Sequence, residues 1–219
     1  MGLKNSHTTA DYLEWNTMLN LVRKLYKDGE YRMSLFIGCG AFFGIRVSDL
    51  RKLTWSMLLT EDKFVISEQK TGKRRVIKIN ADFQKHIQDC FRALNIINTN
   101  EPCFLSRKGM VYSTQRLNVK LKDIKKKYNI KIDNFSCHSL RKCFGRKVFE
   151  SSGENAQLAL VKLSEIFNHS SVAITKIYLG LREQELLDTY DLLDFWPDIN
   201  FITYSVLSQK IAKFAVANP

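Results

Sequence analysis

The sequence predicts a mainly α-helical domain with one small antiparallel β-sheet, an α+β fold. Three prolines and ten glycines in 219 residues favour long helices with few tight turns. Apolar residues recur at helical spacing along most of the chain, and strand-like alternation is confined to a short stretch. Hydrophobic residues make up 45% of the chain and charged residues 26%, a globular balance in a chain long enough to bury a core.

The N-terminal part is predicted to be helical. Residues 10–27 form an amphipathic pattern that Gly29 ends. Residues 30–43 are apolar on nearly every side, which predicts a buried helix. A short helix is expected over residues 47–58.

The sheet is predicted from two neighbouring runs. Residues 63–69 and 74–80 are rich in β-branched and aromatic residues, and the sequence "KTGK" separates them. This pattern predicts a hairpin with Gly72 in its turn. The alternation is imperfect, so the sheet should be small, and residues 102–106 are expected to join it as an edge strand.

The rest of the chain is predicted to be helical, without internal repeats or low-complexity linkers. The expected helical segments are 81–94, 113–129, 138–153, 155–168, 171–180, 182–193 and 201–218.

The excess positive charge is concentrated in the middle of the chain. The net charge is +12, and residues 107–147 hold 13 Lys or Arg against two Asp. A basic block is most often a solvated helix face, but this concentration favours a polyanionic partner, most commonly nucleic acid. Acidic lipid is the rival partner; no apolar run approaches the roughly 18 residues of a membrane span, so we expect no membrane association.

The cysteines and histidines do not have metal-ligand spacing. Five cysteines are scattered and never spaced C-x-x-C, which indicates free thiols in a reducing compartment and no zinc site. The four histidines form no H-E-x-x-H, and no phosphate-cradling glycine loop or G-x-S-x-G occurs. Cys137 beside His138 is a poor nucleophile pair, because neighbours on a helix do not face each other. The sequence therefore favours chemistry without a metal or cofactor.

Two basic residues stand at positions where a partner is needed. Arg46 follows the apolar sequence "FFGI", and a charge at the edge of the core needs something to pair with. Lys70 lies at the tip of the predicted hairpin. Taken alone, these are a surface arginine and a solvated turn lysine.

The C-terminal third adds a second group of chemistry-bearing residues. His138 and Arg141, at i and i+3 on one helical face, can both contact one anion. Asn168 can adopt the left-handed conformation that ends a helix, which leaves His169 in a turn before the helix that carries Tyr178. By itself, Tyr178 is more simply a core aromatic residue.

The order Arg, Lys, His-x-x-Arg, His, Tyr resembles the catalytic signature of the tyrosine recombinases, the phage and transposon integrase family. "GIRVSDLRKLTWSML" is similar to the family's first box, "QKTGKRRVIKI" to its β-hairpin, and "CHSLRKCF" to its H-x-L-R box. "FNHSSVAITKIY" resembles its last box, including the nine-residue gap from histidine to tyrosine. The resemblance covers about residues 8–193 and implies the fold of a DNA breaking-rejoining catalytic domain.

The sequence departs from the family pattern in four respects. Asp49 stands where Glu is commoner, Phe167-Asn168 replaces Leu-Gly, and Lys142-Cys143 replaces His or Arg followed by Thr. The fourth is that the family's N-terminal core-binding domain is expected to be absent. We therefore expect 1–219 to be a single catalytic domain with its core at about 8–193. A tail helix at about 199–219 would be exchanged between protomers or close on its own domain.

The resemblance implies site-specific DNA recombination by metal-independent strand cleavage and rejoining. Arg46 and Arg141 carry permanent charge and can grip a phosphate, which removes the need for a metal. Tyr178 is the implied nucleophile, because its 3′-phosphotyrosyl bond conserves the energy needed for rejoining.

The remaining three roles follow from the family resemblance alone. Lys70 is the implied general acid on the leaving 5′ oxygen. His138 is implied to assist as a general base, and His169 to hydrogen-bond the phosphate. No cofactor is implied.

The expected partner is double-stranded DNA, bound by a homo-oligomer that is a tetramer on DNA and a monomer when free, in the bacterial cytoplasm. The expected DNA-binding residues are Lys73, Arg74, Arg116, Lys120 and Lys142. Three alternatives remain open. They are a type IB topoisomerase-like enzyme, a catalytically silent DNA-binding module derived from an integrase, and a helical RNA-binding protein.

Overall fold

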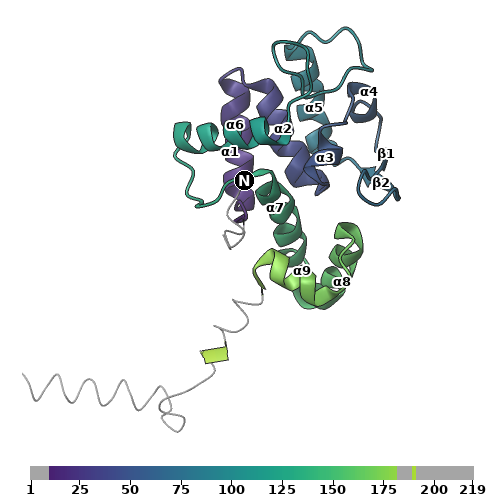
Figure 1. Cartoon of the computed structure of the whole chain (residues 1–219), viewed down its shortest axis with the longest axis vertical. Coiled ribbons are helices and arrows are strands. Elements are labelled where there is room, and N and C mark those ends of the chain that lie inside the picture. The colour runs from purple at the N-terminus through teal and green to yellow at the C-terminus, as the bar shows by residue number, and fades with distance from the viewer. Residues whose placement is uncertain (1–9, 182–188, 191–219) are drawn as a thin grey trace, which may run out of the picture. The chain divides into compact units, whose positions relative to one another are not determined.

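The chain divides into two compact units, Met1–Leu179 and Gly180–Pro219. The structure, a computed structural model, describes residues 10–181 and 189–190, so the first unit is seen almost whole (Figure 1). Its elements are α1 (Trp15–Lys27), α2 (Tyr31–Phe43), α3 (Val47–Leu50), α4 (Trp55–Leu58), β1 (Lys63–Ser67), β2 (Arg74–Lys78), α5 (Ala81–Ala93), α6 (Thr114–Lys127), α7 (Cys137–Glu150), a 3₁₀ turn (Gly153–Asn155), α8 (Ala156–Phe167) and α9 (Val172–Leu179). The predicted fold class, mainly α with a small antiparallel sheet, is confirmed.

Helix α2 is the centre of the core, as its all-round apolar sequence predicts. It packs against α1, α5 and α7, and most of its side chains are buried. Gly40 lets α7 approach closely, because a Cβ there would lie 2.8 Å from the Cβ of Leu140. The small residue therefore sets the position of α7 against α2.

A left-handed glycine ends α2. Gly44 has φ of +56°, and its N–H donates to the carbonyl of Gly40 at 3.2 Å. This C-cap turns the chain sharply from the buried helix into Arg46, the residue that precedes α3.

The single helix predicted over residues 47–58 is wrong, because two short helices occupy this stretch. The Thr54 hydroxyl accepts from the N–H of Met57 at 3.4 Å and caps α4. Thr54 also bridges to Pro102, and the N–H of Cys103 donates to the carbonyl of Leu53 at 2.8 Å. The backbone between α3 and α4 is thus bonded to another segment and does not continue a helix.

The predicted hairpin is confirmed. Strands β1 and β2 pair antiparallel, with Ser67 opposite Arg74, and Gly72 in the turn has φ of +69°. The expected edge strand over residues 102–106 is wrong. Among the described residues the sheet has two strands, and this segment makes only isolated bridges. Pro102 has no N–H to donate to a ladder, which disfavours a strand there.

Helices α8 and α9 pack against α7 and against each other (Figure 1). Gly145 permits the close contact, since a Cβ there would lie 2.6 Å from Leu179 and 3.0 Å from Phe167. The first helix begins at Trp15, later than predicted. Most of the helix expected at 182–193, and all of that at 201–218, lies outside the described residues. None of the helices in the described ranges is long and apolar enough to cross a membrane.

Substituting Gly44→Ala should destabilise the protein by about 2–5 kcal/mol. The left-handed backbone costs about 1–2 kcal/mol for an L-residue, and overpacking adds about 1–3 kcal/mol. The added Cβ would collide with the ring of Phe144. Gly29→Ala is the matched control: φ is +77° and no described atom lies within 4 Å of an added Cβ, so only the backbone cost applies. Urea unfolding of both variants measures the difference, and equal losses of stability would contradict the packing argument.

Candidate active site

Two arginines from distant elements share one carbonyl oxygen. Arg46, which precedes α3, donates from Nη2 to the carbonyl of Phe167 at 2.9 Å. Arg141, from α7, donates from its own Nη2 to the same oxygen at 3.0 Å. Phe167 is the last residue of α8, and a helix C-terminus carries partial negative charge that stabilises cations. The two guanidinium groups are therefore held side by side.

Arg141 is fixed from three directions. Its Nη1 donates to the carbonyl of Gly44 at 2.8 Å, and its guanidinium lies 4.4 Å from the centroid of the Phe167 ring. The residue is only 5% exposed, and burial lowers the pKa of the guanidinium to about 10. A guanidinium has five N–H groups, so these contacts orient it and still leave donors for a ligand.

Tyr178 lies beside this pair with a buried hydroxyl. Its ring packs edge-on against Phe167 at 5.4 Å and His169 at 5.2 Å. Burial raises the pKa of Tyr178 to about 12, while the charges of Arg141 and Arg46 act in the opposite direction. Within the described ranges no group makes a hydrogen bond of ordinary geometry with the hydroxyl, although Arg141 is near. A buried, unpaired hydroxyl is unusual in a structural core tyrosine.

The two predicted histidines take different positions. Asn168 has φ of +50°, the predicted left-handed C-cap, and His169 follows it with Nδ1 3.0 Å from the Thr175 hydroxyl. His138 lies in the first turn of α7 and is exposed. The pKa of each histidine is lowered first by partial removal from water. Arg141 lowers the pKa of both further, joined by Arg46 at His169.

The structure thus brings Arg46, Arg141, His169 and Tyr178 together. His138 and Tyr178 both line an apolar pocket of about 360 Å³. Lys70 is exposed on the hairpin turn and makes no hydrogen bond or ion pair with the described part of the chain.

Sequence reasoning missed a buried carboxylate that contacts the arginines. Glu68 is 5% exposed; its Oε2 accepts from Nη1 of Arg46 at 2.8 Å, and its Oε1 lies 3.9 Å from Nη1 of Arg75. Burial favours a higher pKa for Glu68, but the hydroxyl of Thr71 and the two arginines outweigh it, and the pKa is lowered. The signal was available: strand alternation places Glu68 on the same face as the buried Phe64.

Arg75 was also missed. It donates to the carbonyl of Phe43 at 2.9 Å and to that of Ile166 at 3.4 Å, near the C-termini of α2 and α8. The same two helix ends therefore hold Arg75 and Arg141.

Three of the expected DNA-binding residues lie close to this centre. Lys73 is exposed and donates to the Asn168 side chain at 3.0 Å, and Arg74 is exposed at the start of β2. Lys142 is only 9% exposed, and its amine lies 5.4 Å from the centroid of the Tyr178 ring. It packs against the candidate nucleophile, so of the three it is the least accessible to a large ligand.

The other two lie on a strongly basic depression. Arg116 and Lys120, both from α6, line a pocket of about 640 Å³ together with Arg107 and Lys108. Lys120 also lies 5.2 Å from the centroid of the Tyr112 ring. None of the described residues that line this pocket is acidic, which suits a polyanion.

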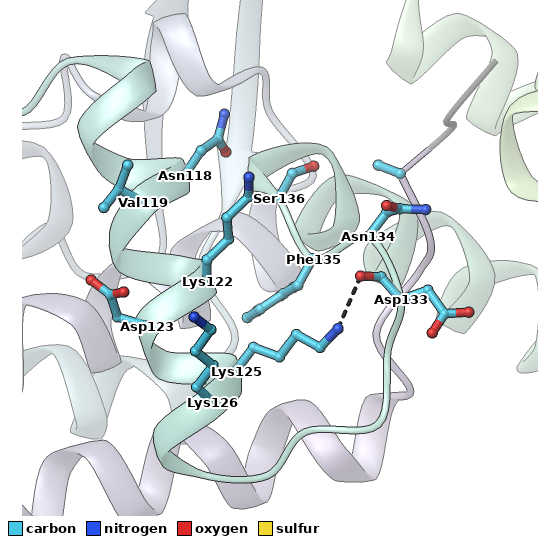
Figure 2. Close-up of a pocket in the computed structure, with 11 residues that line it drawn as sticks. Asn118, Val119, Lys122, Asp123, Lys125, Lys126, Asp133, Asn134, Phe135 and Ser136 are labelled. Carbon is cyan, nitrogen blue, oxygen red and sulfur yellow. Dashed lines mark hydrogen bonds between the residues drawn. The ribbon is translucent and has the colours of Figure 1, made fainter. Parts of the chain in front are cut away.

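A second depression lies further along α6 (Figure 2). Lys122, Lys125 and Lys126 line this pocket of about 710 Å³, but so do Asp123 and Asp133. Figure 2 shows the amine of Lys125 bonded to the backbone carbonyl of Asp133, at 3.0 Å. Because this depression is lined by both lysines and aspartates, it is a weaker anion site than the pocket that contains Arg116.

The five cysteines are not paired in disulfides. All five are buried free thiols, and burial raises the pKa of Cys90, Cys137 and Cys143 to about 12. Among residues 10–181 and 189–190, no three or more His, Cys, Asp or Glu side chains gather in a way that could hold a metal ion.

The fold is that of a tyrosine recombinase catalytic domain. A solved structure, the XerA recombinase, superposes with a TM-score of 0.65 and 24% identity over 85% of this chain and 66% of that chain. The XerH site-specific recombinase, in a post-cleavage complex with palindromic difH substrate, gives a TM-score of 0.63 and 18% identity over 88% and 56%.

Comparison of the sequence with known families and proteins identifies the family of the chain. The model of the phage integrase family matches residues 11–185, and the chain belongs to that family. It is also 26% identical to tyrosine recombinase XerC of Xanthomonas axonopodis pv. citri (strain 306), over 148 residues and 68% of this chain. The chain spans about half the length of the recombinases it matches in sequence, 46% of this one.

The protein should become less stable as the pH falls below about 6.5, the ordinary pKa of histidine. His86, His138 and His169 all have lowered pKa values, mainly through partial removal from water. The unfolded chain therefore binds more protons than the native protein just below pH 6.5, and stability declines as the pH falls. Urea unfolding at pH 7.5 and pH 5.5 tests this; equal or greater stability at pH 5.5 would contradict it.

Proposed function

We propose that this chain is the catalytic part of a site-specific DNA recombinase, which cleaves and rejoins duplex DNA through a 3′-phosphotyrosyl intermediate without a metal ion. The observation that carries the proposal is the buried hydroxyl of Tyr178, which makes no hydrogen bond of ordinary geometry with the described residues, beside two guanidinium groups that share the Phe167 carbonyl. A phosphate gripped by Arg46 and Arg141 would place its phosphorus next to this hydroxyl.

In the proposed cleavage step, the Tyr178 oxygen attacks phosphorus and the bond to the 5′ oxygen breaks. Negative charge grows on the non-bridging oxygens, and Arg46 and Arg141 stabilise it from fixed positions. Because the pKa of Tyr178 is about 12, the phenol is neutral near pH 7 and must lose its proton as it attacks. Rejoining is the reverse, with the 5′ hydroxyl attacking the phosphotyrosyl bond.

The proton transfers are assigned to three further residues. Lys70 gives a proton to the leaving 5′ oxygen. His138, whose lowered pKa keeps it neutral near pH 7, takes the proton of Tyr178. His169, held by Thr175, donates a hydrogen bond to the phosphate.

The DNA backbone would be held by charges around the site. Lys73 and Arg74 on the hairpin, and Arg116 and Lys120 in the basic pocket on α6, support backbone contacts of the kind that position a duplex. Residues of about 8–193 would form the catalytic core of a protomer that assembles into a tetramer on DNA, and the tail at 199–219 would be exchanged between protomers or close on its own domain. The proposed setting is the bacterial cytoplasm.

Tyr178→Phe should abolish covalent attachment to DNA and leave duplex binding intact, because the ring packing survives while the nucleophilic oxygen is lost. The protein is incubated without metal with a pool of nicked duplexes, and DNA-linked protein is resolved on a denaturing gel. Tyr190→Phe is the control, since Tyr190 is 71% exposed and the chemical change is the same. A DNA-linked band that survives in Tyr178→Phe would refute the assignment. Binding without any band in the wild type would favour the silent binding module.

Arg116→Gln and Lys120→Gln should each weaken binding to a generic duplex and flatten its salt dependence. The slope of log K against log salt should fall by about 0.9 for each phosphate that the variant no longer neutralises. Lys85→Gln, on α5, removes the same charge from a 79% exposed side chain and should leave the slope unchanged. Fluorescence anisotropy at several salt concentrations measures the slopes. Three equal slopes would remove the basic pocket from the interface.

A further inference from the structure

Glu68 joins the hairpin to the arginine pair through a single carboxylate. Its Oε2 accepts from Nη1 of Arg46 at 2.8 Å and also from the hydroxyl of Thr71 at 2.9 Å. Thr71 is next to Lys70 in the turn. One buried oxygen atom is therefore bonded both to a residue proposed to grip phosphate and to the loop that carries the proposed proton donor.

The same residue also closes the turn with its backbone. The carbonyl of Glu68 accepts from the N–H of Gly72 at 2.8 Å, and its N–H donates to the carbonyl of Lys73 at 3.0 Å. The Lys73 N–H in turn donates to the Thr71 hydroxyl at 3.3 Å. The conformation of the turn around Lys70 thus depends on Glu68 at both ends of the loop.

We propose that Glu68 is a positioning residue that fixes the Lys70 turn against the arginine pair. The inference rests on the proposed function, in which Lys70 protonates the leaving 5′ oxygen. Lys70 makes no hydrogen bond or ion pair of its own with the described residues, so its neighbours must set its place. Arg46 keeps a second contact, to Phe167 at 2.9 Å, and so depends less on Glu68 than the turn does.

Because the turn depends on Glu68 more than Arg46 does, Glu68→Gln should slow DNA cleavage without weakening DNA binding. The substitution keeps the shape of the side chain, but one amide oxygen cannot replace the charged oxygens toward Thr71, Arg46 and Arg75 together. Duplex binding should be unchanged or tighter, because the variant loses a negative charge beside the arginines. Cleavage should be slower by about 100-fold, the cost of misplacing a reacting group by about 1 Å. A purely structural defect would weaken binding and cleavage together.

A sulfur-substituted substrate distinguishes slow cleavage caused by a misplaced Lys70 from slow cleavage caused by weaker phosphate contacts of the arginines. The duplex that traps wild-type protein is prepared with sulfur in place of the scissile 5′ oxygen. A thiol has a pKa of about 8.5, so the leaving sulfur can depart as a thiolate without receiving a proton. The cleavage of this duplex therefore does not need Lys70. Cleavage of this duplex by Glu68→Gln and by Lys70→Ala should recover to within a few-fold of wild type, and Arg46→Ala should stay slow.

The outcomes distinguish the two proposals. If sulfur fails to rescue Lys70→Ala, or if the wild type cleaves nothing, the proposed function is wrong at that step. If sulfur rescues Lys70→Ala but leaves Glu68→Gln slow, the positioning role of Glu68 is wrong.

A second measurement needs no activity. Hydrogen exchange of the amides at Gly72 and Lys73 should accelerate about tenfold in Glu68→Gln, since losing a charge-assisted hydrogen bond loosens the turn. Glu165→Gln is the matched control: Glu165 is exposed, lines with Glu68 a depression of about 260 Å³ beside the hairpin, and the substitution removes the same charge. Unchanged exchange in Glu68→Gln would overturn the inference whatever the cleavage result.

Discussion

The carbonyl oxygen of Phe167 is the contact on which the site depends. It accepts one hydrogen bond from Arg46 and one from Arg141, which brings residues far apart in the sequence to one point. The C-terminus of α2 acts in the same way, with Gly44 bonded to Arg141 and Phe43 to Arg75. Two helix ends, each with partial negative charge, thus hold three cations without neutralising them. This explains why the left-handed caps at Gly44 and Asn168 matter: each exposes carbonyls that would otherwise continue a helix.

The balance of charge follows from that arrangement. Three buried or half-buried guanidinium groups face the buried carboxylate of Glu68, and the charge of the buried Asp49 also acts on Arg75. The lowered pKa of Arg141 shows that burial disfavours its charge. Carbonyl dipoles offset part of this cost, but they do not remove the net positive charge. A phosphodiester placed between the arginines would offset a further part. The free site therefore carries excess positive charge that suits an anion, and Glu68 tempers that excess when no anion is bound.

Much of the fold and of the candidate site was predictable from the sequence, and the wrong predictions have physical causes. The hairpin with Gly72 and the cap at Asn168 follow from local turn chemistry, and both were predicted correctly. Motif order pointed to Arg46, Arg141 and Tyr178, which the fold brings together. The helix over 47–58 and the strand over 102–106 were predicted wrongly, because their backbones bond to each other across the chain, which no local pattern reveals. Strand alternation could have shown that Glu68 is buried, but its contact with Arg46 forms only in the folded chain.

The candidate residues proposed to stabilise charge are fixed by hydrogen bonds to the protein, whereas those proposed to transfer protons are exposed. Electrostatic stabilisation of a transition state needs groups that are already oriented, since reorienting dipoles during the reaction raises the barrier. Arg46 and Arg141 are held in this way by backbone carbonyls. Proton transfer requires a group to meet an atom that only the substrate brings, and hydrogen bonds of that kind form in the complex. Lys70 and His138 are accordingly exposed. A turn tied at its base by Glu68, with its lysine exposed at the tip, meets both requirements: it limits where Lys70 can reach without holding it to a protein group.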